Sequence, residues 1–380
     1  MGDTPESLET DEAVEAEGEE SWVHDDEVDG APVTWTNGMD TDSTAPHFVE
    51  ILSEATPESQ NVLTNLACGF LADISRRFSG RVRAILKTEG EEMPVGAPLD
   101  KWKAAVSMAV VNGRTVDLTG PAHGDEFVTR ISATTGTYTA EIGSSWDDVM
   151  MSHTMVRQYI AGVQYYRIKG APEPEEINGD AKISMKFRPL NETDESLVVH
   201  RHPISCALRD FAFYVFFNGP ACQQRGDTLD FHLRDVNSVE RAELWRDLIE
   251  YAEGALSLQG GTLTATVDIS SPAAGAHLEH IAHATSVFAT ALSMDKKGYL
   301  AAGGTEKSYT KDARNLAGVC GNAGLSAVGS LQGDLKGSLP SDKETAAVAS
   351  AISEEKDLGF TAHQVSHPGL LKAAADARNS

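Results

Sequence analysis

Three aspartates near the ends of short β-like runs are the first residues in this chain that could do chemistry. They are Asp235, Asp268 and Asp295. Side chains alternate between the two faces of a strand, so Asp268 and Ser270 share one face of the run 262–270. Carboxylates brought together could hold a hard divalent cation. The alternative is that they are rim residues paired with nearby Arg and Lys.

Three other groups of residues have simpler interpretations. His277, His280 and His283 are three residues apart, but no H-E-x-x-H accompanies them, which favours a polar helix face over a metal site. The aromatic block at 211–217 lacks a surrounding basic patch and is typical of a buried helix, not of a base-stacking platform. The four cysteines are far apart and form no C-x-x-C, which indicates free core thiols in a reducing compartment.

Eight β-like runs alternate with helical patterns and must position these residues. We predict strands at 115–120, 137–142, 182–189, 228–236, 262–270, 289–294, 325–331 and 360–365. We predict an amphipathic helix or helix pair over 56–87, a helix capped by Ser238, and Ala-rich helices near 273–286, 310–323 and 342–356. Such alternation implies parallel strands, and eight of them favour a closed (β/α)₈ barrel over an open sheet. No dinucleotide-binding glycine fingerprint or P-loop is present.

The net charge of −26 is unevenly placed along the 380 residues. Residues 1–30 contain thirteen Asp or Glu and no Lys or Arg, so they carry −13 of it. We expect residues 1–45 to be a disordered acidic tail, because such a segment cannot bury enough apolar area to offset its chain entropy. The tail serves solvation or contacts a basic protein partner. The acidic balance argues against nucleic-acid binding.

Targeting signals are also absent from the sequence. No apolar run approaches the ~20 residues needed to span a bilayer, and the first residues lack the basic and apolar regions of a signal peptide. The C-terminal DARNS is no peroxisomal address. We expect an intracellular, reducing location, the cytoplasm foremost.

Several segments of the chain form a colinear series of motifs. They are FLADISRRF (70–78), KWKAAVSMAVVNGRTVDLTGP (101–121), PISCALRDFAFYVFFNGPACQQRG (203–226), SVERAELWRDLIEYAEGALSLQGGTLTATVDIS (238–270) and LGFTAHQVSHPGLLKAA (358–374). In this order and spacing they resemble the malate synthase family, a TIM-barrel family, from about residue 68 to 378. The His-Pro-Gly-Leu ending also occurs in the related citrate lyase β and malyl-CoA lyase group.

The resemblance implies condensation of acetyl-CoA with glyoxylate on a Mg²⁺ ion held by one Glu and one Asp, with an Arg for the enolate charge and an Asp as base. This chain departs from that pattern. The Arg-Pro-Arg-Gly element reads Arg-Pro-Leu-Asn, which keeps Arg188 as a substrate-binding candidate but puts Leu190 at the catalytic arginine. Ser270 stands at the metal-binding Glu and Gly298 at the metal-binding Asp. The family's base belongs to a C-terminal helical domain that would begin where this chain stops.

We therefore predict an acidic tail (1–45), an N-terminal helical segment (46–110) and a malate synthase-like TIM barrel (111–380). We expect a pseudoenzyme without a cofactor, with a binding, scaffolding or complex-subunit role through the tail or the barrel surface, as a homo- or hetero-oligomer, and with no nucleic-acid or membrane partner. Two alternatives stay open. One is a CoA-ester lyase or thioesterase that uses Mg²⁺ and the substrate-binding candidates Asp235, Asp268 and Asp295. The other is malate synthase proper, with its base supplied by another chain.

Overall fold

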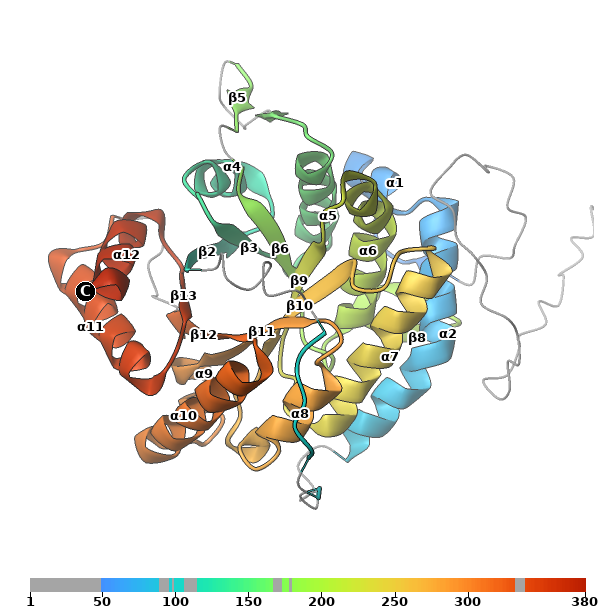
Figure 1. Ribbon diagram of the computed structural model, residues 1–380. Coiled ribbons are helices and arrows are strands. Elements are labelled where there is room, and N and C mark those ends of the chain that lie inside the picture. The colour runs from blue at the N-terminus through green and yellow to red at the C-terminus, as the bar shows by residue number, and fades with distance from the viewer. Residues whose placement is uncertain are drawn as a thin grey trace, which may run out of the picture.

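Eight parallel strands close into a barrel at the centre of the fold (Figure 1). The computed structural model describes residues 49–88, 96–97, 99–105, 115–166, 173–177, 180–331 and 339–380. The order around the barrel is the order along the chain, with the last strand closing onto the first. The strands are β2 (Val116–Pro121), β3 (Thr137–Glu141), β6 (Lys182–Lys186), β9 (Leu229–Leu233), β10 (Leu263–Asp268), β11 (Ala289–Asp295), β12 (Ser326–Leu331) and β13 (Ala362–Val365).

This arrangement is a TIM barrel, as the sequence predicts. Each of the eight predicted strands is present, and its ends lie within three residues of the predicted ones. The largest differences are at β6 and β9, which stop at Lys186 and Leu233. The period-2 pattern therefore identified every barrel strand, while the exact ends depend on where each strand loses its neighbour.

Helices surround the barrel and begin and end at residues with recognisable capping chemistry. Ser238 accepts a hydrogen bond from the Arg241 N–H at 3.2 Å, as predicted for α7. Gly359 takes φ 103° at the end of α11, a conformation that favours glycine. The helices are α1 (Pro57–Val62), α2 (Asn65–Lys87), α4 (Gly124–Ser132), α5 (Trp146–Ile160), α6 (Cys206–Arg225), α7 (Val239–Ala255), α8 (Leu278–Ala284), α9 (Lys296–Ala301), α10 (Glu306–Ala323), α11 (Asp342–Leu358) and α12 (Leu371–Asn379). Two short 3₁₀ turns are η1 (Pro272–Ala274) and η2 (Pro368–Leu370).

The N-terminal part of the described chain is a helix pair that packs on the barrel's helical layer. The pattern over 56–87 resolves into α1 and α2, and α2 lies against α6 and α7 (Figure 1). A short strand, β1 (Val49–Ile51), precedes the pair. The predicted tail lies outside the described residues, as does part of the segment 46–110.

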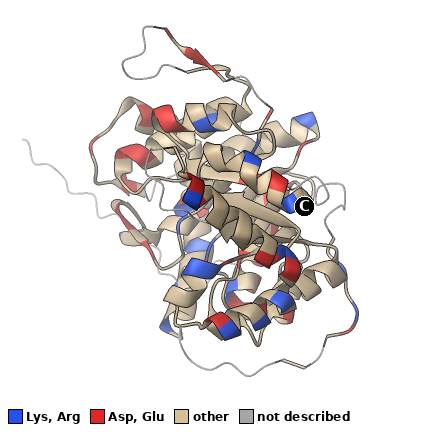
Figure 2. Ribbon diagram, turned by 90° about the vertical axis from the view of Figure 1, so that its left-hand side faces the viewer, with Lys and Arg blue, Asp and Glu red and all other residues tan. Residues whose placement is uncertain are grey.

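Two small antiparallel sheets were not anticipated from the sequence. One joins β1 to β7 (Thr193–Val199) and β8 (His202–Ser205). The other pairs β4 (Tyr165–Tyr166) with β5 (Glu175–Glu176) in a ribbon that projects from the barrel and carries acidic residues (Figures 1 and 2). β4 and β5 have two residues each, too few for a period-2 signal to be recognised.

The main apolar core lies between the barrel and its helices. The aromatic side chains at 211–217 all lie in α6 and are buried, so the core interpretation of this block is confirmed. All four cysteines are buried and free. Burial raises the pKa of the Cys320 thiol to about 12, which makes it a poor nucleophile. Within the described residues, every helix is too short or too polar to span a bilayer.

The inside of the barrel is polar by comparison. Its apolar contribution is a separate cluster of three small side chains, Ala291, Val328 and Ala362. Across the interior, Gln364 Nε2 donates to Thr139 Oγ1 at 3.1 Å, although β13 and β3 are not neighbours. Bulky branched residues usually fill a TIM-barrel interior. Small polar residues here leave the upper part of the barrel open to charged groups.

Candidate functional site

A polar cavity of about 400 Å³ opens at the carboxyl ends of β6, β9, β10 and β11. This is the end at which TIM barrels place their sites. Lys186, Asp268 and Asp295 are the last residues of β6, β10 and β11, and alternation aims them inward. We call this cavity the mouth pocket. It is lined by Lys186, Asn191, His232, Arg234, Asp235, Asn237, Arg241, Asp268, Ser270, Ser271, Asp295, Gly298, Ala302 and Ser330.

The candidate aspartates of the sequence analysis all line this one pocket. Asp268 is the best defined of the three. Its Oδ1 accepts hydrogen bonds from Ser270 Oγ at 2.7 Å and from Ser293 Oγ at 3.2 Å. Ser293 Oγ also lies 3.4 Å from His232 Nε2, so a hydroxyl bridges the carboxylate and the imidazole.

Burial raises the pKa of Asp268 to about 6, and the negative charges of Asp235 and Asp295 act in the same direction. The Ser270 hydrogen bond and the charge of Lys186 lower the pKa of Asp268 and do not offset this. The carboxylates are thus close enough to repel one another, and a positive group placed between them would relieve that repulsion.

Asp295 has a structural role at the first turn of α9. Its carboxylate accepts hydrogen bonds from the N–H groups of Lys297 and Gly298, at 3.1 and 3.0 Å. A side chain at position 298 would begin 3.0 Å from Asp295 Oδ2, closer than ordinary contact. Glycine at 298 therefore lets Asp295 cap α9, and an aspartate there would meet a like charge.

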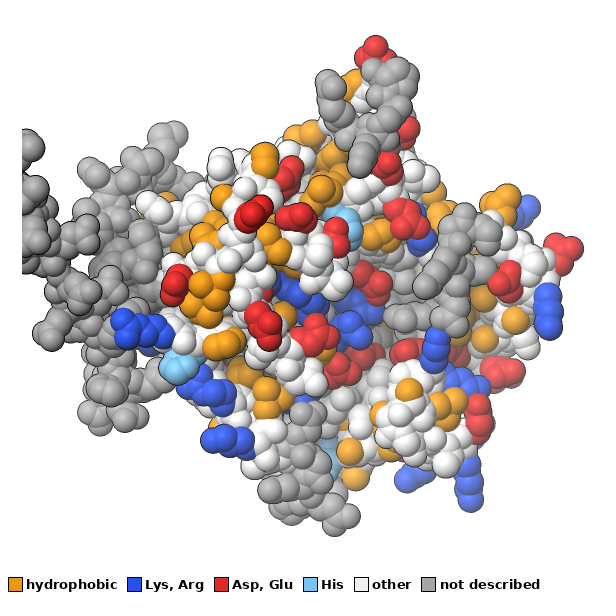
Figure 3. Space-filling model, turned by 180° about the vertical axis from the view of Figure 1, so that it is seen from behind, with side chains coloured by type: hydrophobic (Ala, Val, Ile, Leu, Met, Phe, Trp, Pro, Cys, Tyr) orange, Lys and Arg blue, Asp and Glu red, His pale blue; other side chains and the backbone are white. Residues whose placement is uncertain are grey.

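Three basic side chains line the same pocket as the aspartates. Lys186 Nζ lies 3.0 Å from Glu141 Oε1 and is almost fully buried. Arg241 donates to the Asp235 carbonyl at 2.7 Å. Arg234 is exposed and continues the inward alternation of β9 by two residues beyond His232. Figure 3 shows Lys and Arg side chains in a recess of one face with Asp and Glu beside them, the same mixture of charge.

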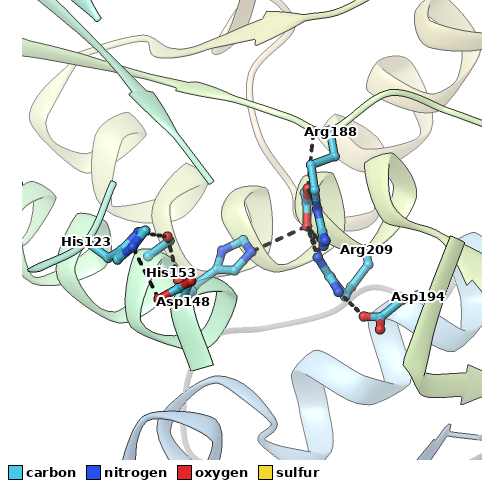
Figure 4. Close-up of polar contacts among 8 residues, drawn as sticks. His123, Asp148, His153, Arg188, Asp194 and Arg209 are labelled. Atoms are coloured by element: carbon cyan, nitrogen blue, oxygen red, sulfur yellow. Dashed lines mark hydrogen bonds and ion pairs between the residues drawn. The ribbon is translucent and has the colours of Figure 1, made fainter. Parts of the chain in front are cut away.

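Arg188 and Leu190 are not among the pocket-lining residues. Arg188 pairs with the fully buried Asp210, whose Oδ2 lies 3.3 Å from Arg188 Nε (Figure 4). The Leu190 side chain is buried in the main core. Of the four residues at 188–191, Asn191 is the one that lines the pocket. At this strand the cation in the pocket is Lys186.

Asp210 belongs to a buried ion network away from the pocket. Arg209 pairs with both Asp194 and Asp210, and all three side chains are less than a tenth exposed. His153 Nε2 lies 4.0 Å from Asp210 Oδ1 (Figure 4). The network contains two arginines and two aspartates, so these four charges balance. It ties α5, α6, β7 and the end of β6 together.

The histidine triplet does not form a metal site. His277 is the residue before α8 and is not inside it, because the predicted helix divides into η1 and α8. His280 Nε2 lies 2.9 Å from the Ala97 carbonyl oxygen, and the His283 ring packs edge-on against Trp102. His280 and His283 thus attach Ala97 and Trp102 to α8.

A divalent cation does not fit the donors of the mouth pocket. Mg²⁺ needs several oxygen ligands at about 2.1 Å around one point. In the described ranges, no three His, Cys, Asp or Glu side chains are arranged to hold a metal ion. Asp295 is engaged by α9, Ser270 Oγ accepts the Asp295 N–H at 2.9 Å, and Gly298 offers no side chain.

The fold and this pocket define the class of protein: a TIM barrel with a polar pocket at the carboxyl ends of its strands. Residues 185–293 match the family model described as malate synthase, TIM barrel domain. Malate synthase of Oryza sativa subsp. japonica is 25% identical over 281 residues, which are 67% of this chain and 49% of that protein. The chain is therefore similar to malate synthases at low identity, and the match to the family model lies within its barrel.

A solved malate synthase structure agrees on the fold. The Haloferax volcanii malate synthase in a lead(II) complex gives a TM-score of 0.51 with 12% identity, over 70% of this chain and 72% of that chain. A citrate lyase β subunit from M. tuberculosis, solved with oxaloacetate and magnesium, gives 0.46 with 10% identity, over 71% of this chain and 99% of that one. The chain spans about half the length of the curated malate synthases it matches.

Sequence reasoning missed the basic and amide groups of the pocket, Lys186, Arg234, Asn191 and Asn237. A signal was available for two of them. Alternation along β9 places Asp230, His232 and Arg234 on one face, and alternation along β6 does the same for Lys186. Asn191 and Asn237 follow their strands in loops, where no period applies.

Proposed function

We propose that this protein is a malate synthase-like barrel that binds a small polar molecule in its mouth pocket and does not condense acetyl-CoA with glyoxylate. The observation that carries the proposal concerns Ser270 and Gly298, the residues that stand at the family's two metal-ligand positions in the resemblance. Ser270 bridges Asp268 to the Asp295 N–H, and Gly298 makes room for the helix cap of Asp295. Both positions have acquired roles that a Glu and an Asp could not fill without breaking these contacts.

The reaction implied by the family needs a metal as Lewis acid, a term worth several kcal/mol of transition-state stabilisation. Lys186 could offer a positive charge to an enolate, but it is already paired with Glu141. If the pocket does not bind an oxo acid, Lys186 has no enolate to stabilise. A binding or complex-subunit role requires only the rigid barrel and the pocket.

An enzyme assay tests the proposal directly. The full chain, mixed with acetyl-CoA, glyoxylate and Mg²⁺, should release free CoA no faster than the reaction without protein, as measured with a thiol reagent. Malate formation, detected by mass spectrometry and abolished by a chelator, would overturn the proposal. The double substitution Ser270→Glu with Gly298→Asp should fail to restore turnover, because the new Asp lies beside Asp295.

A second candidate is a CoA-ester lyase or thioesterase that uses the relocated acids. It is favoured by the finding that Asp235, Asp268 and Asp295 line one pocket. It requires that Mg²⁺ or a CoA thioester stabilise the folded chain, since a ligand that binds only the native state raises the melting temperature. Thermal unfolding with 10 mM Mg²⁺, with acetyl-CoA and with both should show no shift if the first proposal holds.

A further inference from the structure

The mouth pocket contains positive, negative and neutral polar groups that lack a hydrogen-bond or ion-pair partner within the described residues. Within the described residues, no hydrogen bond or ion pair engages the guanidinium of Arg234 or the carboxylate of Asp235. Both bonds to Asp268 reach its Oδ1. Asn237 Oδ1 is buried and lacks a hydrogen-bond partner. A buried polar atom in this state costs free energy unless something else fills the position.

The negative groups of the pocket favour an organic cation over a metal ion. Asp235 and Asp295 both repel the Asp268 carboxylate, so these three carboxylates offer several acceptors to one positive group. An ammonium group donates three hydrogen bonds in separate directions, to acceptors at about 2.8 Å. It can therefore use acceptors that lie too far apart to coordinate one Mg²⁺ ion. The Asp268 carboxylate and Asn237 Oδ1 are acceptors of this kind.

The positive groups favour a carboxylate. Lys186 pairs with Glu141 and Arg241 is buried, so Arg234 is the exposed basic residue of the pocket, and it has no ion pair in the described chain. A guanidinium binds a carboxylate through two parallel N–H donors, and this geometry selects planar anions. The Asn191 side chain lines the same pocket and adds donors.

We propose that the mouth pocket binds a small zwitterion, an α-amino acid or a close analogue, with its ammonium group on Asp268 and its carboxylate on Arg234. This inference rests on the proposed binding function and names the class of ligand. One molecule supplies both charges that the pocket leaves unmatched. Its ammonium takes the place that a metal ion would need, and a cavity of about 400 Å³ is within the range of small-molecule sites.

Matched pairs of ligands test the proposal. Glycine has an amino group where glyoxylate has a carbonyl oxygen. Alanine and pyruvate differ in the same way. Thermal unfolding of the full chain should be followed with each of the twenty amino acids, with glyoxylate and pyruvate, and with methylamine and acetate. At least one amino acid at a hundredfold excess over its dissociation constant should raise the melting temperature by about 2–5 °C. Its oxo acid, methylamine and acetate should each give less than 1 °C, as order-of-magnitude expectations.

Substitutions separate pocket binding from general stabilisation. Asp268→Asn and Arg234→Gln should each weaken binding of the stabilising amino acid at least tenfold by calorimetry, since each removes a charge partner. Asp227→Asn and Arg225→Gln are the matched controls, because they change an exposed ion pair at the end of α6 in the same chemical way. They should leave the dissociation constant within twofold. Arg234 is exposed, so its variant folds even if the Asp268 variant does not.

Two results would overturn the inference. One is that no amino acid shifts the melting temperature. The other is that an oxo acid or methylamine stabilises the chain as much as its amino acid does. Neither result bears on the proposed absence of malate synthesis, which the assay with acetyl-CoA, glyoxylate and Mg²⁺ decides separately. Malate formation with intact amino-acid binding would overturn the proposed function and leave the ligand class standing.

Discussion

At the scale of single residues, Ser270 links two of the aspartates of the mouth pocket. Its hydroxyl donates to Asp268 Oδ1 at 2.7 Å and accepts the Asp295 N–H at 2.9 Å. A glutamate at this position would bring a third negative charge beside Asp268 and Asp295. The hydroxyl instead joins the ends of β10 and β11.

The pKa of Asp268 leads to a prediction about stability. An unfolded Asp has a pKa near 3.9, and Asp268 in the folded chain has a pKa of about 6. The native state therefore binds the proton more tightly, and the ionised carboxylate destabilises the fold above pH 6. Asp268→Asn should raise the free energy of unfolding at pH 7 by about 1–3 kcal/mol. The gain should fall to roughly half by pH 5 and vanish below about pH 4.

Urea unfolding of both proteins at several pH values measures this difference. A gain that stays constant from pH 7 to pH 5 would show that Asp268 is not the titrating group. The matched control is Asp227→Asn, an exposed carboxylate, which should change the free energy of unfolding by less than about 0.5 kcal/mol at any pH in this range.

At the scale of elements, the ion network of Figure 4 joins segments that the barrel alone does not hold. Arg209 in α6 pairs with Asp194 in β7, and Arg188 after β6 pairs with Asp210. The small sheet of β1, β7 and β8 is thereby fixed against the barrel's helical layer. Arg188, a residue kept from the family's motif, stabilises this junction.

Removing the central arginine should be costly. Arg209→Leu leaves Asp194 and Asp210 buried without their cation, and we expect a loss of about 3–5 kcal/mol in the free energy of unfolding. Arg246→Leu is the control, since its partner Asp247 is partly exposed and keeps Arg81 as a second cation, and it should cost less than about 1 kcal/mol. Chemical denaturation of both variants makes the comparison. Equal losses would mean that the buried network contributes no more than a surface pair.

The close approach of β12 and α11 explains why residue 329 is a glycine. A Cβ at Gly329 in β12 would collide with the Glu355 carboxylate of α11. Glu355 cannot move away freely, because it accepts a hydrogen bond from Tyr309 at 3.2 Å and contacts His363 Nδ1 at 3.0 Å. Gly329→Ala should therefore destabilise the fold by about 1–3 kcal/mol.

Gly318→Ala is the control for this prediction. Gly318 lies in α10, and a Cβ there meets nothing within 4 Å. The substitution should stabilise the chain by about 0.5–1 kcal/mol, because alanine favours a helix over glycine. Thermal and urea unfolding report both effects. A neutral Gly329→Ala would show that the Glu355, Tyr309 and His363 contacts are loose.

At the scale of the whole molecule, barrel closure brings together groups from distant parts of the chain. Lys186 and Asp295 are over a hundred residues apart and line one pocket. The main apolar core lies between the barrel and its helices, and the apolar side chains inside the barrel are small. Half of the net charge of −26 falls in residues 1–30, so the barrel itself is only moderately acidic. A basic protein partner for that segment remains a prediction.

The sequence by itself determined the eight strands, the helix pair and the cap at Ser238, and it predicts altered ligand positions at Ser270 and Gly298. These depend on local period, on capping chemistry and on motif order, which neighbouring residues encode. Tertiary structure alone decided that Arg188 turns to Asp210, that Lys186 and Arg234 meet the three aspartates, and that β1 joins β7 and β8. The physical reason is that charge pairing and strand pairing act through space, and many partners are compatible with one local pattern until the barrel closes.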